Sequence, residues 1–218
     1  MTVPINRVAI LGAGRVGTSI ARTLVDAGYE VTLAGSGRPA NVEMIAAFTA
    51  PGASARWAHE ATADADLVIL ALPLHRLSSV NPVVLAGKLV IDAMNYWPPV
   101  DGTIAAFEDA PAGSSVVVRE LLGISHLVKT FNHTGYHDLE PDRRPAGHPE
   151  RLGMAVAGDV AQDVALVAEL INRIGYEPVA LDRLEHGQQL QPGTPLFGAR
   201  PTADDIRRSV TSSVVHSA

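Results

Sequence analysis

Residues 7–17 of the chain are RVAILGAGRVG, an apolar run followed by three glycines with the spacing Gly-x-Gly-x-x-Gly. The run at 7–11 predicts a buried parallel strand, because such strands are apolar on both faces. Apolar side chains recur at a helical period over residues 16–27, and Gly28 stands where a glycine commonly ends a helix. The stretch therefore predicts a strand, a tight turn and a helix in direct succession.

Strand-like and helix-like segments alternate along most of the chain. Further strands are expected over residues 30–34, 54–58, 66–72, 88–92, 127–131, 154–157 and 178–181, and further helices over 41–50 and 161–174. Such alternation predicts an α/β fold, a Rossmann-type doubly wound and mostly parallel sheet with helices on both faces. We expect one domain over residues 1–218, in which the last strands and the tail, about 150–218, form a small C-terminal α/β extension.

Composition narrows the class of protein. The chain has 218 residues, of which 47% are hydrophobic and 18% are charged, so it can bury a large core. It contains no cysteine, which excludes disulfides and thiolate metal sites, and its net charge of −6 argues against nucleic acid or an anionic membrane as partner. No apolar run reaches the roughly 20 residues of a membrane span, and the N-terminus lacks the pattern of a signal peptide. We expect a cytoplasmic protein.

The glycine motif points to a dinucleotide, because it follows a predicted strand and opens a predicted helix. Gly12 would allow the tight turn, Gly14 would let the backbone approach a pyrophosphate, and Gly17 would let helix and strand pack closely. Arg15 and Val16 complete the predicted cofactor-binding loop. The alternative is that these glycines only form an ordinary turn.

The end of the second predicted strand favours NADP over NAD. NAD-binding proteins usually carry an acidic residue there, whereas NADP-binding proteins accommodate a 2′-phosphate with a cation. Residues 33–38 are LAGSGR, without an acid, and Glu30 stands at the opposite end of the strand. Ser36 and Arg38 are therefore candidate ligands of a 2′-phosphate. The alternative is a solvated surface arginine.

Residues after the other strands are expected at the same edge, because ligands of such sheets bind outside the carboxyl ends of the strands. This adds Leu72, Pro73, His75 and Asn95 to the predicted cofactor-binding residues. Asn132 and His133 are candidate substrate-orienting residues, and no catalytic residue is assigned beyond them. Trp97 is a candidate for stacking on a ring.

Two segments depart from the alternation. Residues 132–151 are rich in His, Asp, Arg, Pro and Gly and predict a long loop, which in a compact domain is usually functional. Residues 187–201 contain QPGTP, which predicts turns. His133 and His137 are four residues apart, but Gly135 lies between them in this loop, so no metal site is predicted.

Together these motifs resemble one family, the coenzyme F420-dependent NADP oxidoreductases. The family belongs to a wider group of Rossmann reductases that includes the ferric reductase domains of metazoan membrane proteins. The matching stretches are Gly12–Gly17, Gly35-Ser36 with Arg38, Ala71–Pro73, Asp92–Asn95, Val128–His133 and Gln191–Pro195. The chain departs from the family in Gly37, which separates Ser36 from Arg38, and in the long loop after Asn132.

The resemblance implies reversible hydride transfer between NADP(H) and carbon 5 of a 5-deazaflavin, coenzyme F420, or a related flavin. Two alternatives stay open, an NADPH-dependent reductase of a small carbonyl or imine compound, and a non-catalytic NADP-binding sensor. A carbonyl reductase needs a general acid, and the only lysines are Lys88 and Lys129. A homodimer is expected, because a small domain that binds two large cofactors often uses a partner's surface.

Overall fold

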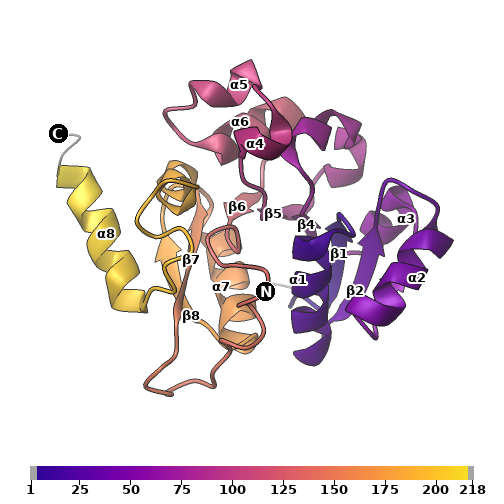
Figure 1. Cartoon of the computed structure of the whole chain (residues 1–218), viewed down its shortest axis with the longest axis horizontal. Coiled ribbons are helices and arrows are strands. Elements are labelled where there is room, and N and C mark those ends of the chain that lie inside the picture. Colours follow the sequence, from indigo (N-terminus) through magenta and orange to yellow (C-terminus); the bar gives the residue numbers. More distant parts are fainter. Residues whose placement is uncertain (1–3, 216–218) are drawn as a thin grey trace.

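A computed structural model describes the backbone of residues 4–215 and the side chains of residues 4–211 (Figure 1). The expectation about the N-terminus falls partly on residues 1–3, which lie outside the described residues. The strands are β1 (Arg7–Leu11), β2 (Glu30–Ala34), β3 (Ser54–Ala55), β4 (Leu67–Leu70), β5 (Leu89–Asp92), β6 (Leu127–Lys129), β7 (Gly153–Gly158) and β8 (Glu177–Leu181). The α helices are α1 (Arg15–Asp26), α2 (Pro39–Thr49), α3 (Ala58–Ala63), α4 (Pro98–Asp101), α5 (Ala105–Glu108), α6 (Ser114–Leu122), α7 (Ala161–Arg173) and α8 (Ala203–Val215). The 3₁₀ helices are η1 (Leu74–Ser79), η2 (Pro82–Leu85) and η3 (Leu184–Leu190).

All these strands form one sheet in the order β3-β2-β1-β4-β5-β6-β7-β8. Neighbours pair in parallel, except that β7 runs antiparallel to β6. The predicted fold class is therefore confirmed. The chain moves outward from β1 on one side and returns to β4 on the other, so the switch point of strand order lies between β1 and β4. Ligands of such sheets bind at the carboxyl edge beside this point.

Helices cover both faces of the sheet. One face packs against α1, α2 and α7 through residues such as Ile20, Val42 and Val167. The other face packs against α3, the 3₁₀ helices η1 and η2, and the segment of α5 and α6, through residues such as Ala61 and Val118. The tail and α8 cover the second face of β7 and β8, at the far end of the sheet in Figure 1. This three-layer arrangement leaves the carboxyl edge to the loops.

Two local predictions need correction. The expected strand at 54–58 ends at Ala55, because Glu60 accepts a hydrogen bond from the Trp57 backbone at 3.2 Å and helix α3 begins there. Helix α6 was not predicted, because its valines favour strands. It forms because it buries Val118 and Leu122 in the core, and such tertiary packing overrides intrinsic propensity.

Candidate functional site

Two glycines of the 12–17 loop are required by packing. Gly12 has φ +132°, and a Cβ there would lie 2.1 Å from the carbonyl oxygen of Ala71, which follows β4. A Cβ on Gly17 would lie 1.8 Å from the carbonyl oxygen of Gly12. The loop is thus folded tightly on itself and on the end of β4, and no larger residue fits at either position.

Gly14 differs from both, because a Cβ there would meet no atom within 4 Å. It is exposed, caps the N-terminus of α1 and brings no side chain to the helix's free N–H groups. Arg15 and Val16, the next residues, are also exposed. A helix N-terminus with uncapped N–H groups and open space before it is suited to bind an anion. The loop is therefore tightly packed at Gly12 and Gly17 and open at Gly14, where a pyrophosphate would approach.

The loop over residues 132–151 packs against this end of α1. It contains neither helix nor strand, which confirms the predicted loop. The Arg15 guanidinium lies 5.9 Å from the centre of the Tyr136 ring and donates to the Tyr136 hydroxyl at 3.3 Å. Ser19 of α1 donates to the Tyr136 carbonyl at 2.6 Å. Further along, Arg143 pairs with Asp26 at 3.1 Å. The loop thus connects α1 to the C-terminal half of the sheet.

The loop after β2 presents two free polar side chains. Ser36 and Arg38 are exposed, and neither side chain has a hydrogen bond or ion pair within residues 4–211. Glu30 pairs in register with Arg7 at the start of the strand, so its carboxylate lies at the opposite edge. A Cβ on Gly35 would lie 2.9 Å from the Val42 side chain, so the loop packs closely against α2 at this position. The end of β2 therefore offers hydrogen-bond donors and no carboxylate.

The residues after β4 are partly engaged by the protein itself. Leu72 is half-buried, and Pro73 is exposed and precedes η1. The His75 ring lies 3.0 Å from the Asp101 carboxylate, which also accepts the His75 backbone N–H at 3.1 Å. His75 thus links η1 to α4, and its ring has a structural partner in addition to its predicted cofactor role.

Asn95 and Asn132 lie together at the ends of β5 and β6. Asn95 donates to the Asn132 carbonyl at 2.8 Å, and the Asn132 amide donates to the Asn95 side-chain oxygen at 3.0 Å. Asn132 also donates to the Leu190 carbonyl at 2.7 Å, which ties the tail to this edge. The side-chain oxygen of Asn132 is buried and has no partner within the described residues. The structure therefore brings these two predicted residues into direct contact.

Sequence reasoning missed a buried charged cluster beneath them. The Lys129 ammonium lies 3.1 Å from Asp92 and donates to the Met94 carbonyl, and Ser115 donates to Asp92 at 2.7 Å. Burial lowers the pKa of Lys129, and the neighbouring Asp92 carboxylate opposes that shift. A sequence signal existed, because Asp92 and Lys129 end two adjacent apolar strands. The cluster fixes the ends of β5 and β6 to each other.

The position of His133 corrects the expectation. We expected it beside the reacting rings, but its ring is 1% exposed and its Nε2 accepts the Ala155 N–H of β7 at 3.4 Å. Burial and the nearby Lys129 lower its pKa to about 4, so the ring is neutral and carries its proton on Nδ1. Phe131, two residues before His133, has φ +67°, in the left-handed region that few residues other than glycine adopt. As placed, His133 cannot reach a ring at the open edge.

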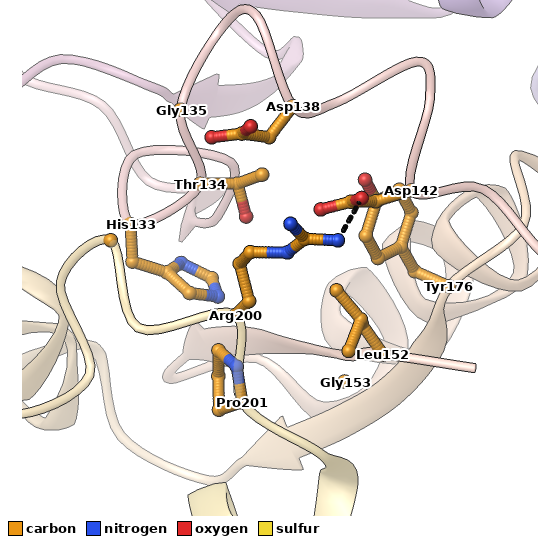
Figure 2. Close-up of a pocket in the computed structure, with 11 residues that line it drawn as sticks. His133, Thr134, Gly135, Asp138, Asp142, Leu152, Gly153, Tyr176, Arg200 and Pro201 are labelled. Atoms are coloured by element: carbon orange, nitrogen blue, oxygen red, sulfur yellow. Dashed lines mark hydrogen bonds and ion pairs between the residues drawn. The ribbon is translucent and has the colours of Figure 1, made fainter. Parts of the chain in front are cut away.

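The side of the His133 ring that faces away from β7 lines a small pocket (Figure 2). Figure 2 shows the Arg200 side chain crossing this pocket to its ion pair with Asp142. His133 Nδ1 and one Asp142 oxygen have no partner within the described residues. The ion pair between Arg200 and Asp142 therefore forms part of the lining of this pocket.

The remaining site classes are limited by two findings. Within residues 4–215, no group of three or more His, Asp or Glu residues is placed to hold a metal ion. His137, the other member of the predicted histidine pair, is exposed and lies 3.3 Å from Asp138. None of the described helices has the length and apolar character required to cross a membrane.

The comparisons with known proteins agree with this geometry. Residues 7–96 match the family of coenzyme F420-dependent NADP oxidoreductases, which confirms the family resemblance over that part of the chain. A search of the curated proteins found no match. Similar solved structures include a hypothetical protein from Sinorhizobium meliloti, with a TM-score of 0.74 and 27% identity over 89% of this chain and 94% of that one.

Two other solved structures share the fold. One is described as a candidate F420-dependent NADP reductase from Arthrobacter sp. FB24, with a TM-score of 0.69 and 23% identity over 85% of this chain and 90% of that one. The other is an imine reductase from Myxococcus stipitatus in complex with NADP+, with a TM-score of 0.58 and 15% identity over 97% of this chain. Only 63% of the imine reductase is covered, so that enzyme has a large part without a counterpart here.

Proposed function

We propose that this protein is an NADP-linked oxidoreductase that binds its cofactor along the carboxyl edge of β2, β1 and β4. The observation that carries the proposal is Gly14, which faces open space at an uncapped helix N-terminus while Gly12 and Gly17 are tightly packed. The N–H groups of α1 would hold the pyrophosphate, and Ser36 and Arg38 would hold the 2′-phosphate. The family match over residues 7–96 supports this cofactor.

We propose a deazaflavin, coenzyme F420, or a related flavin as the hydride partner. NADPH supplies a hydride from its nicotinamide, and the acceptor takes a proton from solvent. This hydride partner is supported by the family match over residues 7–96 and by the later motifs of the chain. Such a transfer depends mainly on alignment of two rings in a dry pocket. Pro73, Asn95 and Asn132 are placed at the strand ends where they could align them.

The two lysines and Tyr96 support alignment over proton donation. Lys129 is buried in its pair with Asp92, and Lys88 donates to the carbonyls of Ala63 and Ala65 at 3.0 and 2.9 Å. The Tyr96 hydroxyl is held by Glu108. A reductase of carbonyl or imine compounds would need a free acid, and none of these three side chains is free.

The test is NADPH oxidation by the full chain with F420, FMN, ferric chelates, a small ketone and a cyclic imine as separate acceptors. We expect turnover with F420, followed by its absorbance, and transfer of the label from stereospecifically deuterated NADPH. His133→Ala should reduce the rate tens-fold at most, whereas loss of a general acid costs about 10²–10⁴-fold. Turnover of the ketone or imine but not of F420 would show that the protein is a reductase of carbonyl or imine compounds and would contradict the deazaflavin proposal. Tight NADPH binding without any turnover would favour a sensor.

Assembly and cellular setting belong to the same proposal. We propose a homodimer that acts on small molecules in the cytoplasm, without nucleic acid or membrane as partner. The net charge of −6 supports the second part. Light scattering of the purified chain across a concentration series tests the first.

A further inference from the structure

Among the side chains that the structure describes, those of three arginines have no partner. Within residues 4–211, the side chains of Arg38, Arg56 and Arg76 make no hydrogen bond, ion pair or ring contact, whereas every other arginine has one. All three are exposed. The chain carries more acidic than basic residues, 23 against 17, so carboxylates are available to pair them. A shortage of carboxylates therefore does not explain why these three side chains are unpaired, and their common location in the fold is the feature to consider.

The three free arginines lie along one edge of the sheet. Arg38 follows β2, Arg56 follows β3 and Arg76 follows β4. These strands and β1 are parallel and adjacent, in the order β3-β2-β1-β4, so their carboxyl ends lie at the same edge. This is the edge of the proposed cofactor site.

The pairing of β3 with β2 places Arg56 beside the candidate 2′-phosphate loop. Leu33 is in register with Ala55, and the Arg56 backbone N–H donates to the Leu33 carbonyl at 3.1 Å. Arg56 is thus level with Ala34, one residue before the Gly35–Arg38 loop, and neighbouring strands lie about 4.8 Å apart. An arginine side chain spans more than that distance. The Arg56 side chain is therefore long enough to reach, from the neighbouring strand, the loop that carries Ser36 and Arg38.

We propose that Arg56 is a second guanidinium ligand of the 2′-phosphate and, with Arg38, sets the preference for NADP over NAD. The inference rests on the proposed function. A phosphate monoester carries a charge of about −1.5 to −2 at pH 7, which one arginine does not neutralise. Two planar guanidinium groups can each donate in a bidentate manner to its oxygens. Gly37 separates Ser36 from Arg38 in the loop after β2. Arg56, which follows β3, would add a second guanidinium to the same phosphate site.

The experiment compares two probes that differ only in the 2′-phosphate, adenosine 2′,5′-bisphosphate and adenosine 5′-monophosphate. Calorimetry with the full chain gives the ratio of their affinities for the unmodified protein and for Arg38→Ala, Arg56→Ala and Arg56→Lys. We expect Arg56→Ala to weaken the bisphosphate about ten- to hundredfold, the effect of a lost charge-assisted hydrogen bond, and to leave the monophosphate unchanged. Arg56→Lys should recover part of the loss, because it keeps the charge without the bidentate geometry.

Arg76→Ala is the matched control, an equally exposed and partnerless arginine at the same edge beyond the glycine loop. It should leave the ratio of the two affinities at the unmodified value. The double variant Arg38→Ala/Arg56→Ala should show a loss that differs from the product of the single losses, because both groups contact one phosphate. A normal ratio in Arg56→Ala, with a reduced ratio in Arg38→Ala, overturns the inference and leaves the proposed function intact. If the unmodified protein binds neither the bisphosphate nor NADPH, the proposed function itself is overturned.

Discussion

The two halves of the carboxyl edge treat their polar groups in opposite ways. Beside β2 and β3, Arg38 and Arg56 are exposed and unpaired. Beside β5 and β6, Asp92 and Lys129 are buried and paired with each other. An exposed guanidinium without a partner can bind an anionic ligand. The charges of a buried ion pair already interact with each other and are not available to a ligand. We therefore expect Arg38 and Arg56 to bind an anion, whereas the pair of Asp92 and Lys129 holds β5 and β6 together.

The strongest test of the binding half is Gly14→Val. The variant should fold, because the position faces open space and has φ −84°, which a valine adopts. It should show no measurable binding of NADPH, because the side chain would occupy the place of the pyrophosphate. Circular dichroism checks the fold and calorimetry checks the binding.

Gly17→Ala provides the contrast within the same loop. Its Cβ would lie 1.8 Å from the Gly12 carbonyl, so this variant should be destabilised as well as unable to bind. Normal NADPH binding by a folded Gly14→Val protein would show that the cofactor lies elsewhere.

The paired half is tested by Lys129→Met. This change leaves the Asp92 carboxylate buried without its cation, which should lower the free energy of unfolding by about 3–5 kcal/mol. Adding Asp92→Asn should restore much of it, because the neutral amide needs no cation, its oxygen can accept the Met94 N–H, and its NH2 group can donate to the Ser115 hydroxyl. Urea unfolding measures both variants.

Lys88→Met is the matched control, since that ammonium donates only to backbone carbonyls near the surface and should matter far less. If Lys129→Met and the double variant are equally unstable, the pair does not act as a unit.

The contrast also explains what the sequence could predict. The glycine loop was predictable because strand, turn and helix are consecutive, so Gly12, Gly14 and Gly17 carry their roles locally. Arg56 was not, because its place beside Ser36 depends on the register of β3 with β2. The expected strand at 54–58 concealed it further, since the strand ends at Ala55.

His133 shows the limit at the other half of the edge. The expected strand over 127–131 ends at Lys129, and Phe131 already adopts a left-handed conformation before His133. The His133 ring accepts the Ala155 N–H of β7, a strand that lies more than twenty residues later in the chain and runs antiparallel to β6. Such pairing between distant segments has no local signal. The long loop over 132–151 was identified for its composition, whereas its contacts with α1 required the fold.

The burial of His133 predicts a dependence of stability on pH. Its pKa is about 4 in the folded protein and about 6.5 when unfolded, so the unfolded state binds more protons between these values. The stability contribution is complete above pH 6.5 and is lost as the pH falls toward 4, by about 3 kcal/mol in total. Urea unfolding from pH 7.5 to 4 should show that His133→Gln loses this part of the slope.

His137→Gln is the control for that measurement, because its ring is exposed and keeps its hydration in the folded state. This variant should keep the part of the slope that His133 contributes. An unchanged slope in His133→Gln would mean that the ring is not buried in neutral form.

The smallest expected effect is at Trp97, which follows β5. Trp97 follows Asn95 by two residues and is 45% exposed, and its ring is stacked on that of Phe197 from the tail, with centroids 6.5 Å apart. A flat deazaflavin beside Asn95 would extend this stack, and an aromatic pair contributes about 0.5–1.5 kcal/mol. Trp97→Ala should therefore raise the KM for F420 about two- to tenfold and leave the Kd of NADPH unchanged. Trp57→Ala, at an exposed tryptophan on the N-terminus of α3, serves as the control and should leave the KM for F420 unchanged. If Trp97→Ala instead weakens NADPH binding and leaves the KM for F420 unaltered, the Trp97 ring contacts the nicotinamide. The hydride acceptor would then not stack on Trp97.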